Sequence, residues 1–145
     1  MKKLIIIVLF AGFALCNASC SKEATAQAQT TINSFVTTYF PDAQILSTIK
    51  DGLDYEVTLS DYTHIEFDGN LFSQLEWDEV DCRRSTTHLA VPNTLVPAEI
   101  KDYVTRLHTG RSIVKISRDR FGWEIELDND LDIEFSRKFV VIEMD

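Results

Sequence analysis

Hydrophobic residues along this chain follow a helical spacing in two separate segments. Over residues 31–40 the apolar positions recur every three or four residues, which predicts an amphipathic helix that Pro41 ends. Residues 97–107 repeat this spacing, with a proline near the start and Gly110 just beyond the end, as expected at helix boundaries. We therefore expect two helices, one in each half of the chain.

The stretches that follow each helix change to a period of two. Apolar and polar residues alternate over residues 55–59 and again over 123–127, which predicts half-buried antiparallel strands. Asp, Asn, Gly and Ser separate such stretches and favour tight turns. We expect four short strands after each helix, near residues 43–50, 53–60, 63–68, 71–79, 112–119, 122–128, 131–136 and 139–144.

The two halves are copies of one unit. A shift of 68 residues aligns residues 32–71 with 100–139 without a gap, and both copies contain the run Ile-Glu-Phe. Such a duplication must be recognised before the fold is inferred. The predicted fold class is α+β: two tandem helix-plus-four-strand repeats form one antiparallel sheet of about eight strands, with both helices on one face. The repeats are residues 31–81 and 96–145, a linker covers 82–95, and together they make a single domain, 31–145.

The N-terminus has the three-part layout of an export signal. Residues 1–3 are a short basic head, residues 4–15 are apolar, and small and polar residues follow. A membrane-spanning helix needs roughly 18 or more apolar residues, and this run is shorter. We assign residues 1–19 to a signal peptide and expect an exported protein.

Two cleavage sites are compatible with this signal. Residues 18–20, Ala-Ser-Cys, resemble a bacterial lipobox, in which the cysteine becomes the lipidated first residue of the mature chain. Residues 24–26, Ala-Thr-Ala, would instead release a soluble chain beginning at Gln27. We favour lipidation at Cys20, with residues 20–30 as a tether. The expected location is the periplasm or the outer membrane, with a lipid anchor as the only attachment to the membrane.

Composition and charge exclude one class of partner. The 145 residues include 23 acidic and 14 basic side chains, giving a formal net charge of −9. Such a surface repels phosphate backbones, so we expect no nucleic-acid binding. The apolar share of 45% is that of an ordinary soluble domain.

The strand alternation places acidic side chains on the sheet face opposite the helices. Burying them would cost on the order of several kcal/mol each, so they must face water or a basic partner. This face is either a solvated surface or a platform for a basic protein or peptide. Trp77 either packs on a helix or anchors a partner. The candidate partner-binding residues are therefore Glu56, Glu66, Glu124, Glu134 and Trp77.

The sequence contains no recognisable catalytic, cofactor-binding or metal-binding motif. Cys82 is the only cysteine outside the N-terminal segment, and no nucleophile signature surrounds it. The histidines, His64, His88 and His108, lack metal-ligand spacing. Residues 128–132 have the spacing of a calcium loop but lack its later glycine and glutamate, so a turn is the better interpretation. We expect a structural thiol at Cys82, no cofactor, and no enzymatic activity.

Four stretches of the sequence carry a family resemblance: residues 65–70 (IEFDGN), 77–82 (WDEVDC), 96–104 (VPAEIKDYV) and 113–127 (IVKISRDRFGWEIEL). They resemble the PepSY-like proteins of bacterial envelopes, which are described as having a β-lactamase-inhibitor-protein-like fold. The resemblance implies an exported α+β protein with tandem helix-plus-sheet halves, and it transfers no catalytic residues.

The sequence therefore favours a non-enzymatic binding module of the cell envelope with a protein or peptide as its ligand. Inhibition of an envelope peptidase or of another enzyme is one form that this role could take. The alternatives are a small-ligand or metal-binding envelope protein and, less favoured, a hydrolase that uses Cys82 or a pair of carboxylates.

Overall fold

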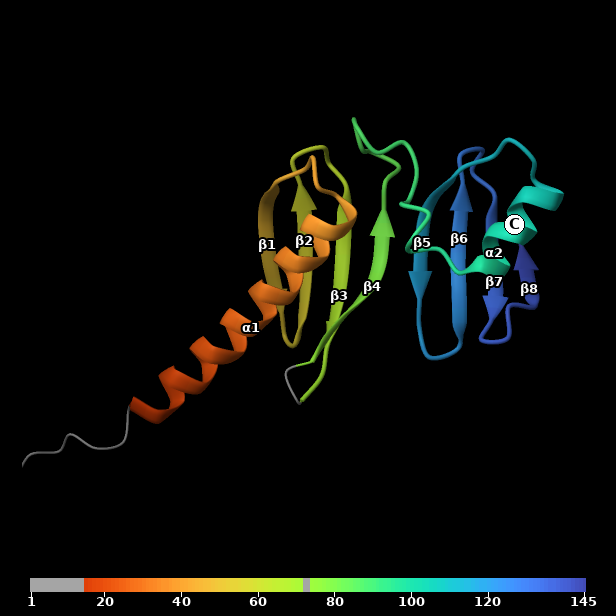
Figure 1. The fold of residues 1–145 in the computed structure, drawn as a ribbon. Coiled ribbons are helices and arrows are strands. Elements are labelled where there is room, and N and C mark those ends of the chain that lie inside the picture. The colour runs from red at the N-terminus through yellow and green to blue at the C-terminus, as the bar shows by residue number, and fades with distance from the viewer. Residues whose placement is uncertain (1–14, 72–73) are drawn as a thin grey trace, which may run out of the picture.

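The structure, a computed structural model, describes residues 15–71 and 74–145, with side chains described from residue 26 onward (Figure 1). Most of the predicted signal peptide therefore lies outside the described residues. The elements follow the predicted order. They are α1 (Leu15–Tyr39), β1 (Ile45–Asp51), β2 (Asp54–Leu59), β3 (His64–Gly69), β4 (Leu75–Asp81), α2 (Ala98–Leu107), β5 (Ile113–Arg118), β6 (Gly122–Leu127), β7 (Asp132–Ser136) and β8 (Val141–Met144).

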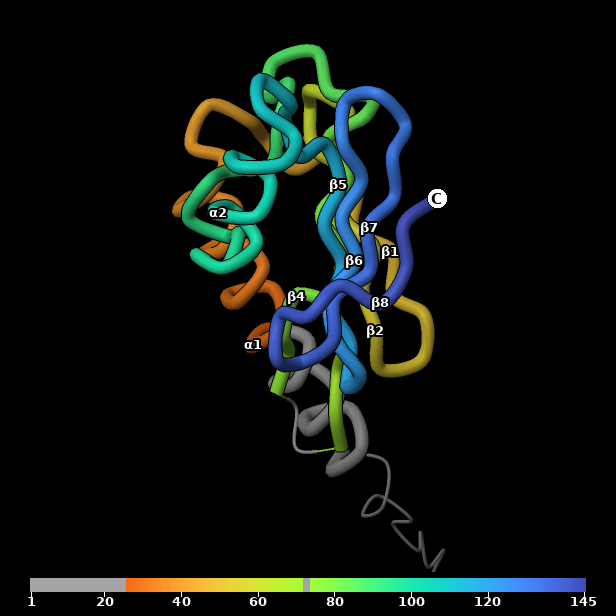
Figure 2. Tube along the Cα trace, turned by 90° about the vertical axis from the view of Figure 1, so that its right-hand side faces the viewer, coloured from red at the N-terminus to blue at the C-terminus, as the bar shows by residue number. Residues whose placement is uncertain are grey.

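The strands form one antiparallel sheet in which spatial order equals chain order, from β1 to β8. The two halves meet where β4 pairs with β5 through three residue pairs, Glu79–Ser117, Val80–Ile116 and Asp81–Lys115. Figure 2 shows α1 and α2 on the same side of the sheet, so the other face is uncovered. The predicted fold class is thus confirmed.

One hydrophobic core lies between the helices and the sheet and includes residues from both halves. Strand positions that were predicted to face the helices are buried, except Trp123, which is partly buried. Burying one such Ile, Leu or Phe side chain stabilises the fold by about 2 kcal/mol. The largest fully buried side chains are Ile32, Phe40, Val57, Leu59, Ile65, Phe67, Ile100, Ile116, Ile125, Leu127, Ile133 and Phe135.

Irregularities of the sheet recur at equivalent positions of the two halves. Leu46 is an extra residue in the pairing of β1 with β2, and Val114, 68 residues later, is the extra residue between β5 and β6. Tyr62 and Asp130, separated by the same shift, both have left-handed backbone angles, with φ of 70° and 61°. The duplication read in the sequence therefore extends to bulges and turns.

The fourth strand contains a bulge at Asp78, so the alternation predicted for this strand is wrong beyond Trp77. Uninterrupted alternation would place Glu79 on the helix side with Trp77, and Val80 on the open face. In the structure Phe67 pairs with Trp77 and Glu66 with Glu79, so Asp78 is an extra residue. Val80 is consequently buried in the core, and Glu79 faces the open side.

Helix α1 begins before the predicted amphipathic stripe. Residues 20–30, assigned above to a tether, belong to α1, and Ala28 is already buried in the core. Ala28 lies four residues before Ile32, one turn away on the same helix face, which explains why it packs against the sheet. In the described part of the chain neither helix combines the length and the apolar character needed to cross a bilayer.

Candidate functional site: the open face of the sheet

Carboxylates, interrupted only by Ser117 on β5, form a row across the open face, at right angles to the strands. Each member lies directly opposite the next on the neighbouring strand, from β2 to β8. We call this set the glutamate row; its members are Glu56, Glu66, Glu79, Ser117, Glu124, Glu134 and Glu143.

The four glutamates predicted from the sequence all lie in this row, and the structure adds two more. Glu79 and Glu143 were missed because a bulge precedes each of them, at Asp78 and at Ile142. Each bulge shifts the alternation by one residue, so counting every second position places the glutamate on the wrong face. In the structure both glutamates lie opposite the second residue of an Ile-Glu-Phe run.

Like charges that lie opposite each other on adjacent strands destabilise a sheet. The glutamate row contains several such pairs, including Glu56 with Glu66 and Glu124 with Glu134. Burial, followed by repulsion from Glu79, raises the pKa of Glu66. The opposed glutamates of the row therefore reduce the stability of the isolated sheet.

Two cations neutralise the acids where the halves meet. Lys115 Nζ lies 2.9 Å from Glu79 Oε2. Arg83, from the linker, donates from Nη2 to Asp81 at 2.5 Å and from Nη1 to Glu126 at 2.8 Å, and so connects β4 to β6. Burial alone would raise the pKa of Asp81, but the hydrogen bonds from Arg83 hold it below its usual value. These contacts join the two halves.

A hollow of about 390 Å³ opens beside the glutamate row in the second half. Its lining includes Glu79, Glu124 and Glu134 from the row, apolar side chains such as Phe121 and Ile142, and the basic side chain of Arg118. Phe121 is 65% exposed and Ile142 is 62% exposed. We call this hollow the acidic groove. It has the volume of a small-ligand or side-chain pocket and combines negative charge with apolar contact area.

Asp78 also lines the acidic groove and has an unusual protonation equilibrium. Burial, followed by repulsion from Asp68, Glu66 and Glu79, raises the pKa of Asp78 to about 6. The surrounding acids therefore disfavour the charged form of Asp78, and they would attract a cation to this position.

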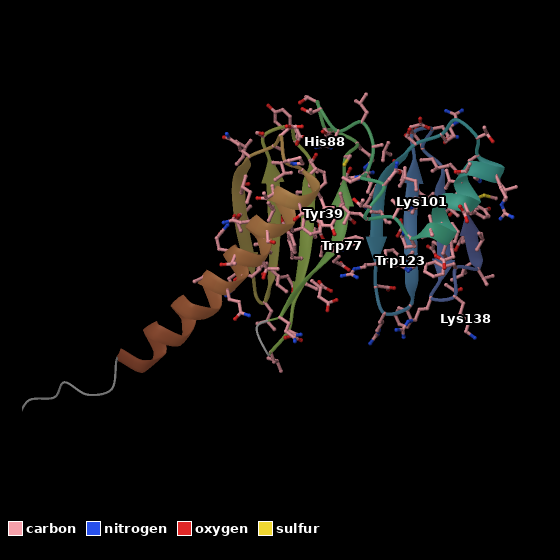
Figure 3. All side chains as sticks on the ribbon, in the orientation of Figure 1. Tyr39, Trp77, His88, Lys101, Trp123 and Lys138 are labelled. Carbon is pink, nitrogen blue, oxygen red and sulfur yellow. The ribbon has the colours of Figure 1, made fainter. Side chains whose placement is uncertain are left out.

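Trp77 lies on the helix side of the sheet, away from the glutamate row. Its ring centroid is 6.3 Å from that of Phe35 and 6.1 Å from that of Trp123, and Figure 3 shows both tryptophans between the two helices. The guanidinium of Arg118 lies over the Trp77 ring at 4.5 Å, and its Nε donates to the Trp77 carbonyl at 2.7 Å. The structure thus brings the four predicted glutamates together and separates Trp77 from them.

The thiol of Cys82 is buried, and its pKa is raised. Its side chain is 2% exposed, and burial raises its pKa to about 12, so the nucleophilic thiolate is negligible near neutral pH. This environment agrees with a structural role for Cys82.

Asp61, Ser85 and His88 attach the linker to the first half. Asp61 is 4% exposed and accepts from Ser85 Oγ at 2.8 Å, while His88 Nδ1 lies 2.5 Å from the same carboxylate oxygen. Burial would raise the pKa of Asp61, yet these hydrogen bonds lower it to about 2. Ser85 donates to the carboxylate, so its hydroxyl is not presented to the imidazole as a nucleophile would be.

Among the described residues one group of metal-ligating side chains converges on the open face: His64, Glu66 and Glu79. The sequence contains no glycine-rich phosphate-binding loop.

A family model described as "Putative beta-lactamase-inhibitor-like, PepSY-like" matches the chain twice, over residues 24–73 and 53–143. The comparison with curated proteins found no match.

Three solved structures are similar to this chain, each with a TM-score of 0.65. A "putative calcium-regulated periplasmic protein" from Bacteroides thetaiotaomicron is 32% identical, over 78% of this chain and 86% of that one. A "putative periplasmic protein" from Bacteroides vulgatus is 33% identical, over 77% and 85% of the two chains. A second Bacteroides vulgatus protein, a "putative periplasmic protein of unknown function", is 28% identical, over 78% and 87% of the two chains.

Proposed function

Because the chain belongs to the PepSY-like family of β-lactamase-inhibitor-like proteins, we propose that it is an exported, non-enzymatic binding module of the cell envelope. Its ligand is a basic segment of a protein or peptide, bound on the open face of the sheet. The periplasmic descriptions of the similar solved structures support export. The high pKa of the Cys82 thiol supports a role without nucleophilic catalysis.

The acidic groove is the observation that carries this proposal. A ligand that presents lysine or arginine side chains beside apolar ones would match its glutamates and its exposed Phe121 and Ile142. Apolar contact would supply affinity, reduced by the entropy lost when the ligand and the groove side chains are ordered. The exposed charges would contribute at most ~1 kcal/mol per pair, and their main effect would be faster encounter.

Inhibition of an envelope enzyme is one form of this role. The family description refers to an inhibitor, and an uncovered sheet face is a broad surface that could cover the mouth of an active site. The lipidated form beginning at Cys20 would hold this face close to the membrane.

Affinity capture with the purified protein as bait tests the proposal. The comparison is between the unchanged protein, a groove variant with Glu124→Gln and Glu134→Gln, and a control with Glu99→Gln and Asp102→Asn on the exposed side of α2. We expect a basic envelope protein to be retained by the unchanged protein and the control, and to be lost with the groove variant. Identical captures by all three proteins would contradict binding at the groove.

A further inference from the structure

A mixed nitrogen and oxygen donor set lies in the first half of the open face. His64 and Glu66 are two residues apart on β3 and therefore point to the same side of the sheet, and Glu79 lies opposite Glu66 on β4. One ligand atom from each residue lies within 4.8 Å of the other two, and His64 Nδ1 is 3.9 Å from Glu66 Oε1. We propose that these three side chains form a binding site for Zn²⁺. The inference does not rest on the peptide binding proposed above.

The kinds of donor favour zinc over the hard cations. Zinc binds imidazole nitrogen and carboxylate oxygen, most often with four ligands in a tetrahedral arrangement. Calcium takes six to eight oxygen ligands, and magnesium requires a near-ideal octahedron of oxygens, so a single imidazole with two carboxylates suits neither. Three protein donors leave one position of a tetrahedral shell for water.

The side chains have the freedom that the geometry requires. Ligand atoms around a tetrahedral zinc at about 2.0–2.2 Å lie roughly 3.3–3.5 Å apart, so donors that are up to 4.8 Å apart must approach by up to about 1.5 Å. The side chains of His64 and Glu66 are 34% and 44% exposed. Rotations about their χ angles can close this gap without moving the strands.

The charges around the site are suited to receiving a cation. Glu66 and Glu79 are opposed like charges on neighbouring strands. Lys115 contacts Oε2 of Glu79, and a carboxylate has a second oxygen to offer a metal. Asp81, which lies opposite His64, is already held by Arg83 and is left out of the donor set. A divalent ion between Glu66 and Glu79 would remove their repulsion.

The duplication supplies an internal control. The equivalent positions of the second half are Asp132, Glu134 and Glu143, where Glu143 again lies opposite Glu134 beyond a bulge. That triad has the same strand geometry but an aspartate in place of His64. Because it lacks the imidazole, we expect it to bind zinc far more weakly, and so we expect one ion per chain.

Isothermal titration of the purified, tag-free protein with zinc chloride tests the site. We expect one zinc per chain with a dissociation constant in the micromolar range, and at least a tenfold loss of affinity in His64→Ala. Asp132→Ala, the matched change in the second half, should leave the affinity unchanged. Circular dichroism checks that each variant is folded, and Glu79→Gln replaces His64→Ala if the latter is not.

Three results would overturn the inference. They are no heat of binding at 100 µM zinc, equal affinities in the unchanged protein and both first-half variants, and complete displacement of zinc by a hundredfold excess of calcium. The last result would identify an oxygen-ligand site that does not use the imidazole.

Discussion

Individual residues of the acidic groove show how the surrounding charges act on one another. Asp78 has its pKa raised to about 6 by burial and by three neighbouring acids, whereas a free aspartate titrates near 3.8. A raised carboxyl pKa means that the charged form is less favourable in the folded protein than in the unfolded chain. Asp78 therefore reduces the stability of the fold increasingly as the pH rises from about 4 through 6.

We expect Asp78→Asn to stabilise the protein by about 1 kcal/mol at pH 7.5, after allowance for solvent screening. Urea unfolding at pH 7.5 and at pH 4 measures the effect. At pH 4 Asp78 is protonated in the folded state, so the gain should largely disappear. A variant that is less stable than the unchanged protein at pH 7.5 would show that the charge of Asp78 is compensated by a favourable contact.

Some residues of the open face could be predicted from the sequence and others could not. Glu56, Glu66, Glu124 and Glu134 lie in uninterrupted alternating strands, so their face could be predicted. The zinc donors could not, because His64 and Glu79 come together only through the pairing of β3 with β4. A histidine on its own in the sequence gives no indication of a partner fifteen residues away.

At the scale of secondary-structure elements, the linker holds the two halves of the sheet together. β4 and β5 share only three residue pairs, and Arg83 bridges from the linker to Asp81 and Glu126 on either side of them. Its neighbour Arg84 is also exposed, and no ion pair to it is recorded among the described residues.

We expect Arg83→Ala to lower the free energy of unfolding by about 1 kcal/mol, since the bridged pairs are partly exposed. Arg84→Ala, the matched control, should change it by a few tenths of a kcal/mol at most. Thermal unfolding in 0.05 M and 0.5 M salt tests both, because screening should shrink the effect at Arg83. Equal losses in the two variants would show that the bridge contributes nothing specific.

The elements themselves were largely predictable, and the exceptions have local causes. Period-two alternation identified β2, β3, β6 and β7, because each has one face on the core and one in water, and the turn signals and the repeat placed the other strands. The bulges at Asp78 and Ile142 were not predictable, since nothing in their residue types marks an extra residue. The early part of α1 was missed because its polar composition obscures Ala28, which belongs to the hydrophobic core.

At the scale of the whole molecule, the two repeats share one core. Val80 of the first half pairs with Ile116 of the second, and both are fully buried. A half of about fifty residues buries too little apolar surface to be comfortably stable alone.

We therefore expect the segment Asn93–Asp145, expressed alone, to lack a cooperative unfolding transition. Calorimetry of this segment beside the full chain is the measurement. A sharp transition close to that of the full chain would show that the halves fold independently.

The central claim is that the acids of the open face govern its encounter with a basic ligand. Glu56, Glu66, Glu124 and Glu134 form a pseudo-symmetric field across the sheet. Such charges act over a screening length of about 8 Å at physiological salt, so their effect must fade as salt increases.

The most direct test is the association rate of a synthetic peptide of alternating lysine and leucine, measured at low and high salt. Changing all four glutamates to Gln should leave the fold intact and slow association at low salt about tenfold, with little difference at 0.5 M salt. The control, with Asp42→Asn, Glu99→Gln, Asp102→Asn and Asp130→Asn, changes the net charge equally at exposed positions elsewhere. It should bind faster than the open-face variant. Equal rates for the two variants at low salt would contradict the claim and would indicate that the glutamate row only keeps the protein soluble.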